Sequence, residues 1–524
     1  MKTRDAGLLA SVALAIALYP AASAQAAEPC VLTQLTTNAA ADTDSRVSGD
    51  RIVWTGYGGS DGGADREIFT WTPALGTVQL TRNDFDESNP VVSGDRVAWL
   101  GHDTSDSEVF TWTPAGGTIQ VTSNAVTDDG VAICGNRIAW WGAGGSDGGS
   151  DPEVFTWTPA AGLKQLTEDG GEQWDPQVSG DLVVWWGYGG SDGGADKEIF
   201  SWAAIAGLAQ LTVNDIDDEN PRVSGERIVW AASFDSGITS EIMTRTLSTA
   251  AVRITNNADY DIAPEVSGDR IVWYGDGGAD AGSDWEIFTW TPVAGTQQIT
   301  QDSDDDDVPQ VCGDRVAWCG YGGADGGVDY ETFTWTPASG ITQITRNSAG
   351  DGPPHISDTW IVFECYETDA EIMLARFGMV PVYRFYNFTN STHFYTDSAT
   401  ERDMVIAAWP HIFRFEGVAY HTSPARNSQR LYRFYNRVSR SHFYTASDTE
   451  AAHVLATWPD VFTLDGRTYA VNPAQPGNDL SVYRFYNLTN GSHFYTASAA
   501  ERDHVMATWP TVYRLEGTAF WIGQ

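Results

Sequence analysis

The sequence predicts a mainly β protein, in which an eight-bladed β-propeller precedes a smaller β-rich domain with short helices. The first observation is a unit of about 45 residues that occurs eight times between Ser48 and Phe363, in the order S-G-D-R-I-V-W, E-I-F-T-W-T-P, T-x-Q-L-T. The second is a different unit that occurs three times after Pro381. The third is an excess of acidic residues that ends where this second unit begins. A fixed period of ~40–45 residues with several short strands is typical of propeller blades.

The tryptophan that ends the first segment sets the period of the propeller. It recurs at Trp54, Trp99, Trp140, Trp185, Trp230, Trp273 and Trp318, with Phe363 in the eighth place. β-branched and aromatic residues dominate both segments, and Ser-Gly-Asp is a turn sequence. Each unit should therefore hold four strands. In the second unit the first strand ends near Val92, and the other three span 96–100, 108–113 and 118–122. The tryptophans are expected to pack between blades.

The ends of the repeat region predict how the ring closes. The eighth unit has its first two segments, at 356–363 and 371–377, but no Q-L-T segment follows. A surplus Q-L-T segment lies at 32–36. We therefore expect a propeller over 30–378 whose N-terminal strand completes the eighth blade and removes an open edge. Cys30 and Cys365 would then share that blade, where a disulfide could lock the ring.

Residues 1–26 are typical of a signal peptide. Lys2 and Arg4 precede an apolar stretch over 7–18, and small residues follow. The stretch is too short for a membrane span, and no other segment resembles one. We expect an exported, extracellular or periplasmic protein without a transmembrane segment, and a monomer.

The net charge of −40 belongs to the propeller. Residues 31–378 hold 16 basic and 56 acidic side chains, whereas residues 379–524 hold 12 of each. Nucleic-acid binding is disfavoured because neutralising phosphates requires a basic surface. Cations or a basic partner are favoured, and solubility alone is the other explanation.

Two sets of acidic loops are expected on one face of the propeller, because strands in a blade alternate in direction. Carboxylates between Gly turns suit Ca²⁺, which takes six to eight oxygen ligands. The other explanation is that each Asp caps its own turn. Transition metals are disfavoured because the propeller holds only His102 and His355. The candidate Ca²⁺ ligands are Asp61, Asp65, Asp84, Asp86, Asp147, Asp151, Asp192, Asp196, Asp215 and Asp217.

Residues 379–524 contain Y-R-F-Y-N and H-F-Y-T motifs three times, each followed by a helix with a capping box that begins at Ser398, Ser447 or Ser498. Three copies predict one pseudo-threefold, β-trefoil-like domain with inserted helices. Aromatic and polar groups side by side can hold a sugar, although a shared structural role or a Zn²⁺ site on the pseudo-axis would also produce the pattern. The candidate ligand-binding residues are His393, His442, His493, Tyr386, Tyr435 and Tyr486.

Both repeats resemble known families. Ser-Gly-Asp-Arg before an apolar strand, followed by E-I-F-T-W-T-P and Q-L-T, resembles the TolB-like (WD40-like) propeller repeat over 31–378. That resemblance implies binding of a protein or ligand at the propeller face and does not by itself imply catalysis. The C-terminal motifs resemble a secreted-protein repeat of unknown function, which implies an attachment or carbohydrate-binding role.

These observations predict an exported, non-enzymatic binding or adhesion protein. The acidic propeller face would bind cations or a protein partner, and the C-terminal domain would attach to a protein or polysaccharide at the cell surface. The alternative is a polysaccharide lyase or glycosidase that uses propeller-channel carboxylates and a bound metal. A charged residue in the channel that departs from the repeat would favour the enzyme.

Overall fold

The computed structural model describes residues 30–522, except 58, 60–64, 103–105, 147–149, 169, 192–195, 235–236, 238, 279–283, 325, 327, 358, 423–428 and 474–479. The expected signal peptide at 1–26 lies outside the described residues. Among the described residues, no helix is both long enough and apolar enough to cross a membrane.

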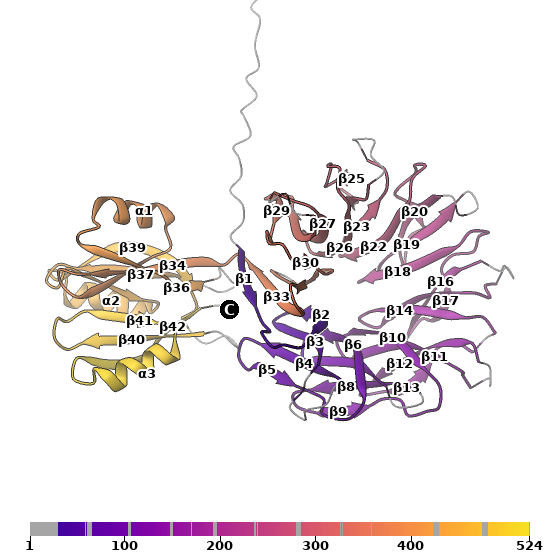
Figure 1. The fold of residues 1–524 in the computed structure, drawn as a ribbon, viewed down its shortest axis with the longest axis horizontal. Coiled ribbons are helices and arrows are strands. Elements are labelled where there is room, and N and C mark those ends of the chain that lie inside the picture. The colour runs from indigo at the N-terminus through magenta and orange to yellow at the C-terminus, as the bar shows by residue number, and fades with distance from the viewer. Residues whose placement is uncertain are drawn as a thin grey trace, which may run out of the picture.

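The described residues up to Phe377 form a series of antiparallel sheets that resemble propeller blades (Figure 1). Sheets one and two comprise β2 (Asp42–Ser48), β3 (Arg51–Tyr57), β4 (Arg66–Thr72), β5 (Gly76–Gln79), and β6 (Asp86–Ser93), β7 (Arg96–His102), β8 (Ser107–Thr113), β9 (Gly117–Gln120). Sheets three and four comprise β10 (Asp128–Cys134), β11 (Arg137–Ala143), β12 (Pro152–Thr158), β13 (Gly162–Gln165), and β14 (Gln173–Ser179), β15 (Leu182–Gly187), β16 (Glu198–Ala203), β17 (Gly207–Gln210). Sheets five and six comprise β18 (Asp218–Ser224), β19 (Arg227–Phe234), β20 (Thr239–Thr246), β21 (Val252–Arg253), and β22 (Asp261–Ser267), β23 (Arg270–Gly275), β24 (Glu286–Thr291), β25 (Gly295–Gln298). Sheet seven comprises β26 (Asp306–Cys312), β27 (Arg315–Tyr321), β28 (Tyr330–Thr336) and β29 (Gly340–Gln343).

Sheet eight takes its outer strand from the N-terminal end of the described chain. It comprises β30 (Gly350–Asp351), β31 (His355–Ser357), β32 (Trp360–Tyr366), β33 (Ala370–Phe377) and β1 (Cys30–Gln34), which pairs antiparallel with β33. In the preceding sheets the Thr that ends Q-L-T accepts a hydrogen bond from a backbone N–H of the third strand, as Thr81 does from Ile68. In sheet eight Thr36 accepts the same bond from Ile372 at 2.9 Å. The surplus segment therefore occupies the place expected from the sequence.

The possible disulfide between Cys30 and Cys365 is not formed, because the strand register holds the two residues far apart. Cys30 lies opposite Phe377 at one end of β33, and Cys365 lies opposite Glu371 near the other end. Six residues of a strand span about 20 Å, whereas a disulfide needs Cα atoms within about 7 Å. Membership of one sheet was predicted, but the register keeps the two sulfurs apart.

Neighbouring sheets are joined by the Ser-Gly-Asp turns. The backbone N–H of each turn Gly donates to the turn Ser of the preceding sheet, as Gly94 does to Ser48 at 3.0 Å, and Cys134 replaces the Ser acceptor for Gly180. The same bond from Gly49 to Ser357, at 2.8 Å, joins the first sheet to the last. The innermost strands also contact one another around a circle, including β2 with β31.

The repeated tryptophans lie in the apolar layers between sheets, as expected. Trp99, for example, packs with Val97 of its own sheet and with Val53 and Ile68 of the sheet before. It also stacks on Phe110 of the adjacent strand at 5.9 Å between ring centroids. Burial of these rings stabilises the packing of neighbouring sheets.

Three three-stranded sheets with one helix each follow. They comprise β34 (Val380–Asn387), β35 (Thr392–Thr396), α1 (Ala399–Ala408), β36 (Phe413–Thr422); β37 (Gln429–Asn436), β38 (Ser441–Thr445), α2 (Asp448–Thr457), β39 (Phe462–Val471); and β40 (Leu480–Asn487), β41 (His493–Thr496), α3 (Ala499–Thr508), β42 (Tyr513–Ile522). We call them repeats one, two and three. Buried side chains from all three, among them Val382, Leu431 and Val482, form one shared core.

Each helix begins at its predicted Ser N-cap, but the Glu of the capping box has another partner. Ser398 accepts the N–H of Glu401 at 3.1 Å. The Glu401 carboxylate pairs with Arg433 of repeat two at 2.9 Å instead of returning to the cap. Glu450 pairs in the same way with Arg484 of repeat three, and Glu501 with Arg384 of repeat one. These three ion pairs connect the repeats in a closed circle.

Candidate functional sites

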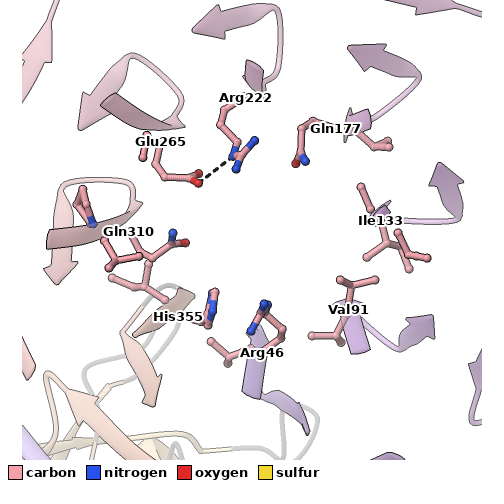
Figure 2. A pocket seen from close by; sticks show the side chains of 17 residues that line it. Arg46, Val91, Ile133, Gln177, Arg222, Glu265, Gln310 and His355 are labelled. Atoms are coloured by element: carbon pink, nitrogen blue, oxygen red, sulfur yellow. Dashed lines mark hydrogen bonds and ion pairs between the residues drawn. The ribbon is translucent and has the colours of Figure 1, made fainter. Parts of the chain in front are cut away.

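One position in each innermost strand of the propeller breaks the regularity of the repeat. It is followed in every sheet by Val or Ile, yet it varies in charge and size itself. From sheet one to sheet eight it is Arg46, Val91, Ala132, Gln177, Arg222, Glu265, Gln310 and His355. These residues line a central cavity of about 540 Å³, which we call the channel (Figure 2). This set was not predicted from the sequence, although alignment of the eight units shows the position as the exception in each repeat.

A β-bulge aims this position at the channel. In sheets one to seven a residue with positive φ lies two positions earlier, and the strand register shifts between them, as for Asp44 (φ 57°) before Arg46. A bulge bends its strand and redirects the following side chains. In sheet seven the left-handed residue is Val308, with φ 50°. A β-branched residue seldom adopts this conformation, and such strain is concentrated at functional sites.

Arg222 is fully engaged on one side of the channel. Its Nε donates to Glu265 at 2.9 Å and its Nη1 to Asp175 at 3.0 Å. Gln177 donates to the other oxygen of Asp175 at 2.9 Å. Burial acts to lower the pKa of Arg222, but the two carboxylates outweigh it and raise that pKa, so the guanidinium stays charged and is fully paired.

Arg46 and His355 lie next to each other on the opposite side (Figure 2). Among the described residues, no carboxylate lies within ion-pair distance of Arg46, whose Nη1 donates to the carbonyl of Ser45 at 2.9 Å. Burial lowers the pKa of Arg46, and Glu364, Asp44 and Glu265 oppose this only over longer distances. Burial and the neighbouring Arg46 hold the pKa of His355 well below its ordinary value. The pair is therefore a cation beside a neutral imidazole.

The two acidic loop sets share one face, as expected. Asp86 accepts the backbone N–H of Arg66 at 2.8 Å, and Asp217 accepts that of Lys197 at 2.9 Å. These bonds connect the loop that enters a sheet with the loop between the second and third strands of the preceding sheet. Both aspartates thus cap backbone at this face.

The other candidate Ca²⁺ ligands fall into three groups. Asp84 and Asp215 are exposed. The Oδ2 atoms of Asp65, Asp151 and Asp196 are buried and have no hydrogen-bond partner. Asp61, Asp147 and Asp192 lie outside the described residues. Within the part of the chain that the structure describes, no group of three or more Asp, Glu, His or Cys side chains is placed to hold a metal ion.

A second set of carboxylates, which the sequence analysis did not single out, is buried between strands. Each lies twelve residues before a repeated Trp and accepts its indole N–H at 2.6–2.9 Å, with Gln173 in the same place in sheet four. Burial raises the pKa of Asp218 to about 6 and that of Asp306 to about 8. The Trp-bonded acids are Asp42, Asp128, Asp218, Asp261 and Asp306.

The candidate histidines of the C-terminal domain lie at the junctions between repeats. His393 packs on Phe494 and lies 3.4 Å from Glu416. His442 likewise packs on Phe394 and lies near Asp465. His493 packs on Phe443 and lies near Glu516. Each also contacts its candidate tyrosine, Tyr386, Tyr435 or Tyr486, at 5.3–5.4 Å between ring centroids. The structure thus brings each predicted His and Tyr together.

A cleft of about 470 Å³ lies at the junction of repeats two and three. His453 and Trp458 line it from α2 and its C-cap, and Tyr486, His493 and Arg514 line it from repeat three. Trp458 is 45% exposed. Arg514 lies over the Tyr486 ring at 5.2 Å, held by Glu516 at 3.2 Å. The cleft offers an aromatic face beside several charged hydrogen-bonding groups.

The two remaining junctions differ in composition. The junction of repeats three and one has the same four residue types as the cleft: His504 and Trp509 from repeat three, and Tyr386 and Arg414 from repeat one. At the junction of repeats one and two, Met404 and Thr463 replace the His and the Arg. Trp409 is retained there, 40% exposed.

A family model described as a domain of unknown function (DUF5648) matches residues 361–470 and 459–524. Comparison with curated protein sequences finds no match.

Solved structures resemble the chain at low identity. The β-propeller domain of the Trilobed protease from Pyrococcus furiosus has 11% identity and a TM-score of 0.41, covering 59% of this chain and 98% of that one. A prolyl endopeptidase has 10% identity and a TM-score of 0.43, covering 65% of this chain and 54% of that one. Oligogalacturonate lyase from Vibrio parahaemolyticus has 13% identity and a TM-score of 0.41, covering 68% and 99%. This chain thus spans about half of the endopeptidase, and these likenesses concern the fold alone.

Proposed function

We propose that this is an exported, non-enzymatic binding protein that attaches to a cell-surface glycan through the junction clefts of its C-terminal domain. The observation that carries the proposal is the half-exposed Trp458 facing a cleft whose other wall holds Tyr486 and Arg514. The C–H face of a sugar packs on an aromatic ring, while its hydroxyls bond to fixed polar groups. An ion pair with Glu516 at 3.2 Å orients the Arg514 guanidinium before binding, which reduces the entropic cost of binding.

The fold proposal is that the eight sheets are the blades of one TolB-like eight-bladed propeller, and that the three C-terminal repeats form one β-trefoil-like domain. The bonds from Gly49 to Ser357 and from Ile372 to Thr36 support closure of the propeller. The circle of Glu–Arg ion pairs supports threefold organisation of the second domain.

The acidic propeller face is proposed to take Ca²⁺ or a basic protein partner. Supporting this, Glu198 is only 1% exposed and its Oε2 has no hydrogen-bond partner among the described residues. Burial raises its pKa, and the nearby Asp218 and Asp196 add to the effect. Buried ionised oxygens without partners are costly, and a bound cation would offset that cost.

An enzyme is the second candidate, because the channel holds charged residues that depart from the repeat. A glycosidase fits poorly, since that chemistry needs two carboxylates. Glu265 is the one carboxylate among the described residues that line the channel, and it is paired with Arg222. A polysaccharide lyase fits better, because neutral His355 beside Arg46 could accept a proton next to a bound carboxylate. Eliminative cleavage of acidic polysaccharides by the parent, lost in His355→Gln, would favour this candidate.

The glycan proposal is tested with the full chain on a glycan array and on isolated cell-wall material. Trp458→Ala and Trp509→Ala should each weaken retention, and the double variant should nearly abolish it, because two complete clefts contribute avidity. Trp409→Ala is the matched control, since its junction lacks the His and the Arg. Equal losses for all three variants, or retention by the double variant, would contradict the proposal.

A further inference from the structure

The channel lies inside the most acidic part of the chain, yet it contains a cation that pairs with no carboxylate of the described residues. The propeller carries the entire net charge of −40, so an arginine has many possible partners nearby. Arg222 has two of them at 2.9–3.0 Å. Arg46 occupies the equivalent position in sheet one and has none within ion-pair distance among the described residues. The contrast between two equivalent arginines indicates that Arg46 is kept available for a ligand.

The groups around Arg46 complete a binding surface for an anion. His355 lies beside it as a neutral imidazole that can donate one N–H. Gln310 lies on the other side of His355, in sheet seven, and its side-chain amide can both donate and accept hydrogen bonds (Figure 2). Val91 and Val308 provide apolar wall. A guanidinium with neutral donors and apolar neighbours is the usual composition of a small-ligand pocket.

We propose that the channel binds a small organic carboxylate, with the ligand's carboxylate on Arg46 and His355 and its body against Gln310 and the valines. The inference is independent of the glycan site in the C-terminal domain.

A carboxylate fits better than a phosphate because of charge. Among the described residues the site offers one cation without an ion-pair partner, since His355 is neutral and Arg222 is already paired with two carboxylates. A monoanion matches that single charge, whereas a dianion would add uncompensated negative charge to an acidic domain. The planar guanidinium also matches the two oxygens of a carboxylate. Two sources share this chemistry: a sugar acid and the C-terminus of a short peptide.

The test uses four probes with the full chain, observed by saturation-transfer NMR and by calorimetry. D-glucuronate is compared with D-glucuronamide, and trialanine with its C-terminal amide; each pair differs by the carboxylate. We expect at least one acid to bind at least about tenfold more tightly than its amide, the ratio implied by charge-assisted hydrogen bonds worth about 1.5–3 kcal/mol. Binding of glucuronate alone would identify a sugar acid, and binding of trialanine alone a peptide C-terminus. Failure of both acids, or equal binding of acid and amide, would overturn the proposal.

Variants locate the site. Arg46→Gln should remove the preference for the acid. Arg46→Lys keeps the charge but loses the planar guanidinium with its paired N–H donors, so it should retain part of the preference. Arg66→Gln is the matched control, because Arg66 lies on the acidic face 3.7 Å from Asp86 and not in the channel. If Arg46→Gln does not fold, the Lys variant and the comparison of acid with amide still decide. Unchanged discrimination in a folded Arg46→Gln variant would refute the assignment.

Discussion

The hydroxyl of Tyr395 donates to the carbonyl of Tyr495 at 2.7 Å and accepts that residue's backbone N–H at 3.2 Å. Tyr444 makes the same pair of bonds with Tyr395, and Tyr495 makes them with Tyr444. All three rings are buried in the shared core of the C-terminal domain. Each repeat thus satisfies backbone groups that its neighbour leaves open, and burial raises the pKa of all three phenols, which keeps them neutral.

Tyr395→Phe should destabilise the C-terminal domain by about 1–3 kcal/mol, because it leaves a buried carbonyl and a buried N–H without partners. Chemical denaturation followed by near-UV circular dichroism would measure the change. Tyr432→Phe is the control, since its hydroxyl bonds to Asp448 at the exposed surface. Similar effects of the two substitutions would contradict the role of the tyrosine ring.

Deleting residues 30–36 should lower the melting temperature of the propeller by several degrees. The deletion removes β1 and exposes the edge of β33, together with the bond from Ile372 to Thr36. Differential scanning calorimetry would detect the shift. Thr36→Val removes that one bond and should cost only about 1 kcal/mol. A deletion variant that melts with the parent would disprove closure by this strand.

Asp306→Asn should stabilise the protein, and the gain should be larger at pH 8 than at pH 5. Burial raises the Asp306 pKa from 3.8 to about 8, so between these values the folded state holds a proton that the unfolded state has released. Stability from this group is therefore present at low pH and lost as pH rises through the window. Asn keeps an acceptor for the Trp318 indole, as Gln173 does for Trp185.

The expected gain at pH 8 is at least about 1 kcal/mol, because one pKa unit corresponds to about 1.4 kcal/mol. Urea denaturation across pH 5–8 would measure it. The exposed Asp84→Asn serves as the control and should show no comparable pH dependence. A constant difference between Asp306→Asn and the parent across the range would contradict the linkage.

Millimolar Ca²⁺ should raise the melting temperature of the propeller, and a chelator should reverse the effect. Binding to the folded state alone stabilises it in proportion to ligand concentration. NaCl at equal ionic strength controls for screening of the acidic face. Asp196→Asn should reduce the Ca²⁺ response but not the Na⁺ response. Equal shifts with both salts would leave screening as the whole explanation.

The strands, turns and helix starts were predictable from the sequence because their causes are local. Ser-Gly-Asp turns and alternating apolar residues set the strands around each Trp, and Ser398 caps its helix through residues three positions away. The surplus segment at 32–36 was assigned to sheet eight because each repeat shows what is missing from the last one. The repeat pattern does not give the strand register, and the register is what keeps Cys30 and Cys365 from forming the possible disulfide.

The sequence by itself determined the repeats, the strand for closure and the concentration of acid in one domain. Only the tertiary structure decided which of these residues can act together. A bulge turns the variable position toward the channel, so Arg46 and His355, far apart in the chain, become neighbours. The tertiary structure also distinguishes Arg46 from Arg222, because an ion pair depends on a few ångströms of geometry that composition does not contain. The clefts between C-terminal repeats have the same origin, since each is built from residues of two repeats.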